Sequence, residues 1–284
     1  MANNVNLLKS RDSKNDEFYT PYGEIADELQ HYTSYFDGKT VYCNCDDPKK
    51  SNFVKYFVEH FKVLGLKKLV ATTLANTGSG VCFVYDGKGV DTETMLGNGD
   101  FRSEECVELL KAADIVVTNP PFSLFNKYVG QLLDYDKKFI IIGNKNAITH
   151  NDISSYIKEN KLWAGCRSFK GDMWFETETG MMNVSGCWFT NMDHYKRHVP
   201  LQLISHYSPE KYQKYDNYDG IEVGRVKDIP FDYKGVMGVP ITFLDRYCPE
   251  QFEIVGFRRG NDGRNLHMNG KQVYFRVLIR KKQI

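Results

Sequence analysis

The sequence predicts an α/β protein with a largely parallel sheet, and three observations support this. Short β-branched and apolar runs, typical of strands buried on both faces, alternate with amphipathic helical segments. One of these runs ends in two prolines, at the kind of strand end where open α/β sheets bind ligands. The 284 residues, 42% hydrophobic and 26% charged, are enough for the full core of an ordinary globular protein.

The first predicted element is a helix that begins after residues 17–20. Thr20 is a good N-cap, Pro21 suits the first helical position, and apolar residues follow at helical spacing. Tyr19 lies directly before the predicted cap. The alternative is that this stretch is only a capped helix start, without a functional role.

The first strand, residues 39–45, runs into an acidic turn, and a helix begins near Ser51. This order is that of the first unit of a nucleotide-binding sheet, but the glycine-rich fingerprint of dinucleotide sites is absent. A cofactor without phosphate remains compatible, with its ammonium on Asp46 or Asp47 and its carboxylate at the helix N-terminus. A solvated acidic turn is the alternative.

The second strand, residues 68–74, lacks the acidic residue that usually binds a ribose at its end. Residues 75–95 are glycine-rich and predict a hairpin insertion, and a tight turn at 97–101 precedes a helix at 104–112. The Asp100 carboxylate could receive the amino group of an adenine ring, on which Phe101 could pack. For Asp100, a turn or helix cap fits the spacing equally well.

The strand at 114–118 ends at Asn119-Pro120-Pro121-Phe122. Neither proline can donate a ladder hydrogen bond, and each restricts the residue before it, so the chain forms a rigid corner. The Asn119 side-chain oxygen and the Pro120 carbonyl can each accept one N–H of a planar exocyclic amine, and Phe122 can stack on its ring. Alternatively, the prolines merely end the strand and Phe122 packs in the core.

The remaining alternation predicts a helix and then further strands, with an Asn269-Gly270 hairpin turn near the C-terminus. The helix is expected at 124–133 and the strands at 138–143, 167–175, 184–190, 236–243, 252–257 and 273–278.

The C-terminal third is basic. Residues 190–284 contain 16 Lys and Arg against 11 Asp and Glu, whereas residues 1–189 contain 21 against 25. Arg258, Arg259 and Arg264 cluster in one loop, and residues 206–219 interleave tyrosines with lysines. Both features suit contacts to nucleic-acid phosphates and bases. A chance surface imbalance and a solvated loop are the alternatives.

The seven cysteines are scattered, with no CxxC pair and no His/Cys ligand spacing. This predicts reduced thiols, a cytoplasmic location and no metal site. No signal peptide or membrane-spanning apolar run is visible, so no membrane partner is expected.

Four segments resemble adenine-specific DNA methyltransferases of the EcoRI-type modification methylase family: residues 16–29, 41–57, 97–125 and 237–256. The resemblance implies a Rossmann-like class I methyltransferase fold that uses S-adenosylmethionine. Residues 1–191 would form the catalytic, cofactor-binding domain, and residues 192–284 the DNA target-recognition region. The residues with implied roles are Asn119, Pro120, Pro121 and Phe122 in catalysis and Tyr19, Thr20, Pro21, Asp46, Asp47, Ser51, Asp100 and Phe101 at the cofactor.

The activity expected from this resemblance is methylation of the adenine N6 amine in double-stranded DNA, by direct displacement on a base flipped onto Phe122. Arg258, Arg259 and Arg264 are candidates for DNA contacts. A cognate restriction endonuclease acting separately, or a solitary methylase, is expected. Methylation of cytosine N4, an RNA base or a protein glutamine stays open, as does a DNA-binding protein without catalysis.

Overall fold

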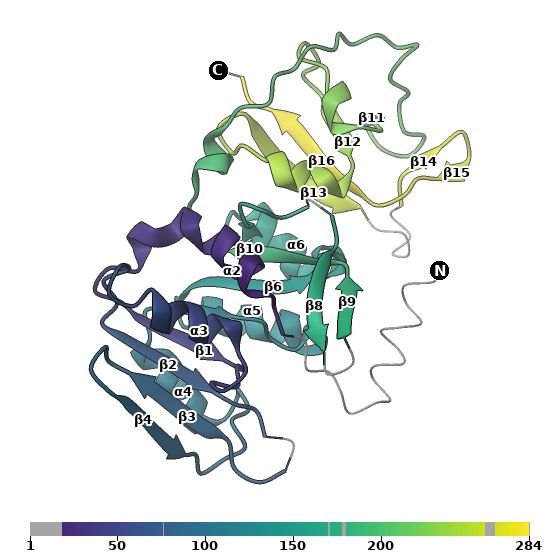
Figure 1. Ribbon diagram of the computed structural model, residues 1–284. Helices are drawn as coiled ribbons and strands as arrows, with labels where there is room; N and C mark the ends of the chain where they lie inside the picture. Colours follow the sequence, from purple (N-terminus) through teal and green to yellow (C-terminus); the bar gives the residue numbers. More distant parts are fainter. Residues whose placement is uncertain (1–18, 76, 170, 178–179, 259–264, 284) are drawn as a thin grey trace. The chain divides into compact units, whose positions relative to one another are not determined.

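The computed structural model describes residues 19–75, 77–169, 171–177, 180–258 and 265–283 (Figure 1). The chain divides into two compact units. The first comprises Met1–Asn144 and Gly171–Cys187, and the second comprises Lys145–Lys170 and Trp188–Ile284.

Within the described residues, the first unit contains strands in the order β4-β3-β2-β1-β5-β6. β2, β1, β5 and β6 run parallel, and the hairpin β3–β4 adds antiparallel strands beside β2. Because the chain passes from β1 to β2 on one side and returns to β5 on the other, the strand order reverses between β1 and β5. The predicted α/β sheet and hairpin insertion are confirmed. The bounds are β1 Thr40–Asn44, β2 Lys68–Thr72, β3 Val81–Tyr85, β4 Val90–Thr94, β5 Ile115–Thr118 and β6 Lys138–Asn144.

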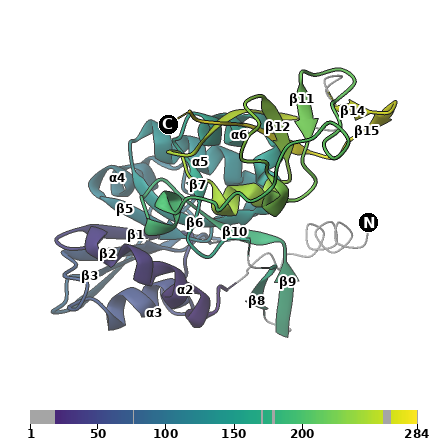
Figure 2. The same ribbon diagram turned by 90° about the horizontal axis from the view of Figure 1, so that it is seen from above.

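Helices cover both faces of this sheet. Figure 2 shows α2 and α3 on one side and α4 and α5 on the other. The sheet is therefore shielded twice, and β1 and β5 are buried along their whole length, as their continuous apolar runs predict. The helices are α2 Tyr22–Leu29, α3 Asn52–Glu59, α4 Glu104–Ala112 and α5 Phe125–Asp134.

A second hairpin of the first unit consists of β8 (Met173–Thr177) and β9 (Gly180–Val184). Strand β8 pairs with Tyr19, the first described residue. Tyr19 and Glu176 exchange backbone hydrogen bonds of 2.9 and 2.8 Å. The N-terminal segment and this hairpin are thus held together.

The second unit contains a four-stranded sheet in the order β11-β12-β16-β13. Tyr215, Val236, Leu266 and Leu278 form a buried cluster in this unit. Phe189 and Thr190 of β10 pair antiparallel with Ala164 and Trp163 of β7. The bounds are α6 Asn151–Lys158, β7 Trp163–Ala164, β10 Gly186–Thr190, β11 Gly220–Glu222, β12 Val236–Val239, β13 Phe252–Arg258, β14 His267–Met268, β15 Lys271–Gln272 and β16 Arg276–Lys281.

Some predicted boundaries were wrong. The strand expected at 236–243 stops at Val239, because Pro240 cannot donate to the ladder, and a 3-10 helix follows at Ile241–Arg246. The strand expected at 167–175 begins only at Met173. Thr20 is not the cap of the first helix, which begins at Tyr22 with Pro21 at the N-cap position.

Within the described residues, no helix combines the length and apolar character needed to cross a bilayer.

Candidate active site

Most of the predicted site residues converge at one edge of the first unit's sheet, beyond the carboxyl ends of β1, β2 and β5. Asp46 follows β1, Asn119 follows β5, and the turn before α4 contacts the end of β2. This is the edge at which the strand order reverses, where open α/β sheets form their binding crevice.

Asp46 is the centre of a buried polar network. Ser51 Oγ donates to its carboxylate at 2.7 Å, and Thr118 Oγ approaches the other carboxylate oxygen at 2.5 Å. Thr118 also hydrogen-bonds the carbonyl of Asn44, and the Asp46 amide donates to Thr72 O at 3.0 Å. The cofactor loop predicted after β1 is therefore tied to the last residue of β5, directly before Asn119.

Burial raises the pKa of Asp46 to about 7, against the hydrogen bonds from Thr118 and Ser51, which lower it. A cationic partner stabilises a buried carboxylate strongly, because it replaces the stabilisation of the charge that water would otherwise supply. Asp47 is placed differently. Its carboxylate accepts the Lys49 amide at 2.9 Å and shapes the turn. Of the two acids, Asp46 is the better candidate for an ammonium group.

The segment Tyr19–Pro21 packs against the same loop. Asn52 Nδ2 donates to Thr20 O at 2.9 Å, and Lys50 Nζ lies 5.7 Å from the centre of the Tyr19 ring. The Thr20 hydroxyl is buried and has no hydrogen-bond partner among the described residues. A buried hydroxyl of this kind fits a site that a ligand completes.

The corner at Asn119–Phe122 has the extended backbone that its prolines predict. Pro121 is extended, with φ −56° and ψ 122°, and a short 3-10 helix, Phe122–Leu124, leads into α5. Asn119 is half-buried, with its side-chain oxygen shielded from solvent. The Phe122 ring is only partly buried and meets Phe175 of β8 edge to face at 6.2 Å. The Phe122 ring, three residues after Asn119, is thus in contact with a neighbouring ring without being enclosed in the core.

Asp100 and Phe101 lie in a turn that packs against the end of β2. Gly99 has φ +82°, and a Cβ there would overlap the Thr73 carbonyl, so glycine is required. Phe101 is buried against Tyr128 of α5, at a centroid distance of 4.9 Å. Asp100 is paired with Arg102 at 2.6 Å, and this hydrogen bond lowers the pKa of its carboxyl. A ligand amine at Asp100 would share the carboxylate with a partly exposed guanidinium.

Of the three arginines predicted to contact DNA, Arg258 lies in the second unit, with its guanidinium 5.3 Å from the centre of the Tyr218 ring. Arg259 and Arg264 are outside the described residues.

Comparison with known proteins adds the family to this geometry. The model of the family described as "Adenine-specific methyltransferase EcoRI" matches residues 6–88 and 83–282, nearly the whole chain. The chain belongs to this family. Since the match includes both the β1 loop and the corner after β5, the site described above lies within the family's matched region.

Three relatives align with this EcoRI-type methyltransferase over almost their whole length. The Type II methyltransferase M.EcoRI of Escherichia coli is 45% identical over all of the chain and 98% of that protein. The Type II methyltransferases M.MgeORF184P of Mycoplasma genitalium and M.MpnI of Mycoplasma pneumoniae are 38% and 36% identical over 97% of the chain. A solved structure, YeaZ from Pseudomonas aeruginosa, matches at 10% identity with a TM-score of 0.19, too low to inform the fold.

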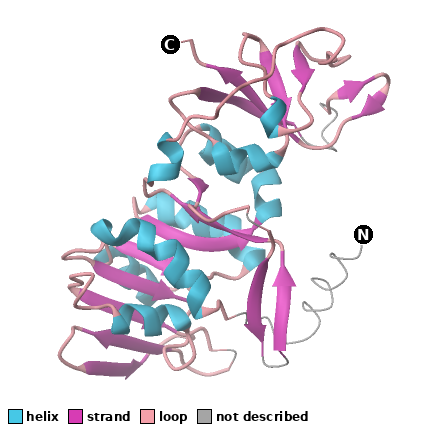
Figure 3. Cartoon of the chain, turned by 45° about the horizontal axis from the view of Figure 1, so that its top comes forward, coloured by secondary structure: helices cyan, strands magenta, loops and turns pink. Residues whose placement is uncertain are grey.

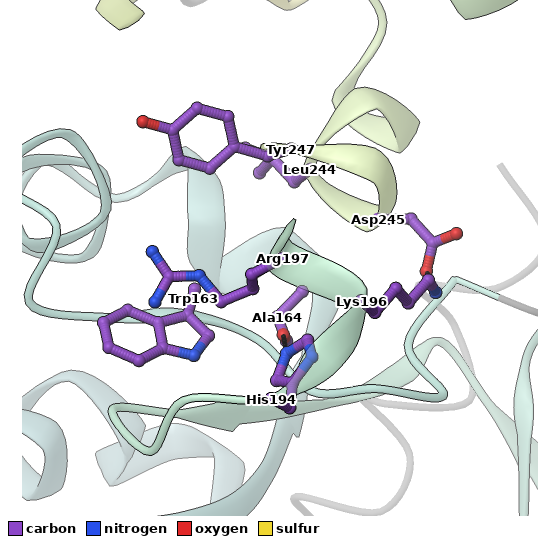
Figure 4. A pocket seen from close by; sticks show the side chains of 8 residues that line it. All are labelled: Trp163, Ala164, His194, Lys196, Arg197, Leu244, Asp245 and Tyr247. Carbon is purple, nitrogen blue, oxygen red and sulfur yellow. Dashed lines mark hydrogen bonds and ion pairs between the residues drawn. The ribbon is translucent and has the colours of Figure 1, made fainter. Parts of the chain in front are cut away.

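A small pocket lies in the second unit of the EcoRI-type chain (Figure 4). Its volume of about 10 Å³ holds about one water molecule. Arg197 stacks 3.5 Å above the centre of the Trp163 ring, and Lys196 pairs with Asp245 at 2.5 Å. His194 Nε2 donates to Ala164 O at 3.0 Å, and burial lowers the pKa of this histidine to about 4. The residues that line the pocket therefore hold the segment after β10 against β7. The pocket itself is too small for a substrate.

The site described above includes two residues that the sequence did not single out. Thr118 was visible only as the polar end of an otherwise aliphatic strand, which is a weak signal. Phe175 contacts Phe122 from a distant hairpin, and nothing in its local pattern indicates that contact.

Proposed function

We propose that this chain transfers a methyl group from S-adenosylmethionine to the N6 amine of adenine at specific sites in double-stranded DNA. The observation that carries the proposal is the Asn119–Phe122 corner at the carboxyl end of β5, tied through Thr118 to Asp46 at the end of β1. The relatives' names, all Type II methyltransferases, support the same activity. The sheet order and its reversal between β1 and β5 support a Rossmann-like class I methyltransferase fold for the first unit.

The corner would act by accepting hydrogen bonds. The lone pair of an exocyclic amine is delocalised into its ring and is a poor nucleophile. The Asn119 side-chain oxygen and the Pro120 carbonyl each take one N–H, which favours a pyramidal nitrogen and aims its lone pair outward. The Asn119 oxygen is shielded from water, and a hydrogen bond is stronger at such a position.

Phe122 would hold the base. An adenine inside a duplex cannot reach the corner, so it must leave the stack and be received by another flat surface. The partly exposed Phe122 ring offers that surface, and it makes an edge-to-face contact with Phe175.

The first unit also fits the cofactor. Asp46 would hold its ammonium group, Thr20 and the α3 N-terminus at Ser51 would face its amino-acid end, and Tyr19, Pro21 and Asp47 would line the same loop. Phe101 would pack on its adenine, with Asp100 near the ring's amino group. When bound, S-adenosylmethionine would supply the electrophilic methyl group.

The thiols of the site argue against a covalent base adduct, the route to carbon methylation of cytosine. Burial raises the pKa of Cys43 and of Cys45 well above the usual value, so both stay protonated at neutral pH. A protonated thiol is a poor nucleophile. Direct displacement on a nitrogen is the chemistry that these residues support.

The C-terminal region, residues 192–284, would recognise the DNA target, with Arg258, Arg259 and Arg264 as candidate contacts. Its positive charge, 16 basic against 11 acidic residues from 190 onward, supports phosphate contact. We also expect a cytoplasmic enzyme, with or without a separate cognate endonuclease.

The test is methyl transfer from tritiated S-adenosylmethionine to unmethylated genomic DNA, followed by nucleoside analysis. We expect N6-methyladenine with the wild type and a loss of at least about a hundredfold with Asn119→Ala, because a transition-state acceptor is removed. Asn183→Ala, which truncates an exposed amide on β9, is the matched control and should retain full activity.

Label on cytosine N4, RNA or protein would keep the mechanism and change the substrate. An absence of transfer to any of these, together with intact DNA binding, would refute the enzyme and leave a DNA-binding protein.

A further inference from the structure

The second unit carries an exposed two-stranded ribbon, β14–β15, set apart from its four-stranded sheet (Figure 3). Asn269 and Gly270 form its turn, with φ values of 53° and 72°, the conformation of a type I′ hairpin. Residues 269–272 at the tip are all exposed. A ribbon this short is marginally stable alone, so its position must be fixed by other contacts.

Two side chains from another segment brace the ribbon. The Asp216 carboxylate accepts hydrogen bonds from the backbone N–H of Asn269 at 3.2 Å and from that of Gly270 at 2.8 Å. The Asn217 side chain accepts the His267 amide at 2.9 Å and donates to a backbone carbonyl at the ribbon's base at 2.6 Å.

The base of the ribbon is anchored as well. Leu266, directly before β14, is buried in the cluster with Tyr215, and Val273, directly after β15, packs against that cluster. An exposed polar tip is thus held in one place from both ends.

The tip carries amide and cationic side chains. It presents Asn269, Lys271 and Gln272, and no Asp or Glu occurs from His267 to the end of the chain. The only carboxylate that the described contacts place at the turn is that of Asp216, which is directed at backbone amides. Asn269 Nδ2 is itself held by Gln213 at 3.3 Å, so this amide is oriented before any ligand arrives.

The β3–β4 hairpin of the first unit has a similar build and the opposite charge. Asp86 braces its turn by accepting the amides of Lys88 and Gly89 at 2.9 and 3.0 Å. Its exposed strand β4 carries Asp91 and Glu93. Phosphate groups would be repelled there and attracted to the tip of β14–β15.

We propose that the β14–β15 tip enters the major groove of the DNA substrate and sets sequence preference. The inference rests on the proposed function and deepens it. A two-stranded ribbon fits the width of the major groove, and a glutamine can bond an adenine edge there in a bidentate manner. Gln272 reads a base edge, Lys271 contacts a phosphate, and Asp216 and Asn217 are positioning residues.

The test compares the wild type with Gln272→Ala, Lys271→Ala and Lys88→Ala, the last being the matched control on the acidic hairpin. Each protein methylates a randomised DNA library, and single-base sequencing of N6-methyladenine gives the relative rate at each sequence. At one position of the DNA recognition sequence, Gln272→Ala should reduce the rate ratio between the preferred base and the other bases about tenfold. Lys271→Ala should slow all sequences equally, and Lys88→Ala should match the wild type.

Binding gives an independent readout. The affinity for a fixed duplex should depend less on salt in Lys271→Ala, by about one unit in the slope of log affinity against log salt, and should be unchanged in Lys88→Ala. Thermal melting at wild-type temperature shows that the variants fold.

An active wild type whose sequence preference and salt slope survive both tip substitutions would overturn the groove assignment alone. If the wild type methylates nothing, the proposed function fails. The salt slopes then still decide whether the tip contacts DNA.

Discussion

Two strand ends at the same edge of the first unit are built in different ways. The end of β5 is made rigid by covalent structure, because Pro120 and Pro121 restrict the backbone wherever they occur. The end of β1 is held by side chains from elsewhere, with Ser51 and Thr118 both bonded to Asp46. The first end presents neutral acceptors and a ring, and the second presents an ionisable group with its pKa near 7.

The difference assigns two tasks. A reaction that depends on aiming a lone pair needs acceptors that do not move, which proline supplies. Binding a cationic group needs a carboxylate that the cation stabilises strongly. A buried carboxylate meets this need, because burial has removed the water that would otherwise stabilise its charge. Substitutions at β5 should therefore change the rate of transfer, and substitutions at β1 should change cofactor affinity.

After Asn119→Ala, the largest effect in this comparison is expected for Phe122→Ala. Loss of a stacking surface for the flipped base should slow single-turnover methyl transfer about tenfold to a hundredfold. The dissociation constant for S-adenosylmethionine should stay within about twofold of wild type. Phe122→Tyr keeps the ring and should recover most of the rate; equal rates for Phe122→Ala and the wild type would assign this ring to packing alone.

A smaller effect, tied to pH, is expected at the β1 end. Calorimetric titration with S-adenosylmethionine should give the highest affinity at about pH 7.5, where Asp46 is largely ionised and the cofactor's ammonium group is still largely protonated. Below about pH 7 the affinity should fall, by up to about tenfold per unit, because Asp46 must lose a proton before it can pair with an ammonium.

Asp46→Asn should remove this pH dependence and weaken binding at pH 8 by about tenfold, the value of a charge-assisted hydrogen bond. A wild-type affinity that is flat from pH 6 to 8 would contradict the assignment of the ammonium to Asp46.

The smallest effect is expected for Thr20→Val. The shape is kept, and the hydroxyl has no partner among the described residues, so the melting temperature should not fall. S-adenosylmethionine should bind about threefold to tenfold more weakly, since one hydrogen bond to the ligand is lost. A variant that melts several degrees lower and binds the cofactor normally would make Thr20 a structural residue instead.

The same contrast explains what the sequence could predict. The corner at Asn119 depends on neighbours in the chain, so its pattern is visible in a few letters. The Asn269-Gly270 turn is local in the same sense and was also predicted correctly.

The network at Asp46 could not be predicted. Its bond to Thr118 joins residues 72 positions apart. Whether Asp46 or Asp47 lies buried depends on that contact and not on the composition of the turn. The misassigned cap at Thr20 has a similar cause, because Asn52 fixes the Thr20 carbonyl and the helix begins two residues later.

The capture of a flipped adenine at the Asn119–Phe122 corner is tested most directly by a crystal structure of the chain with duplex DNA and a cofactor analogue that cannot transfer its methyl group. We expect an adenine outside the helix, stacked on Phe122. Its N6 atom should lie about 2.7–3.2 Å from both the Asn119 side-chain oxygen and the Pro120 carbonyl. A target base that remains stacked in the duplex, or an N6 atom beyond about 4 Å from both acceptors, would contradict the role assigned to this corner.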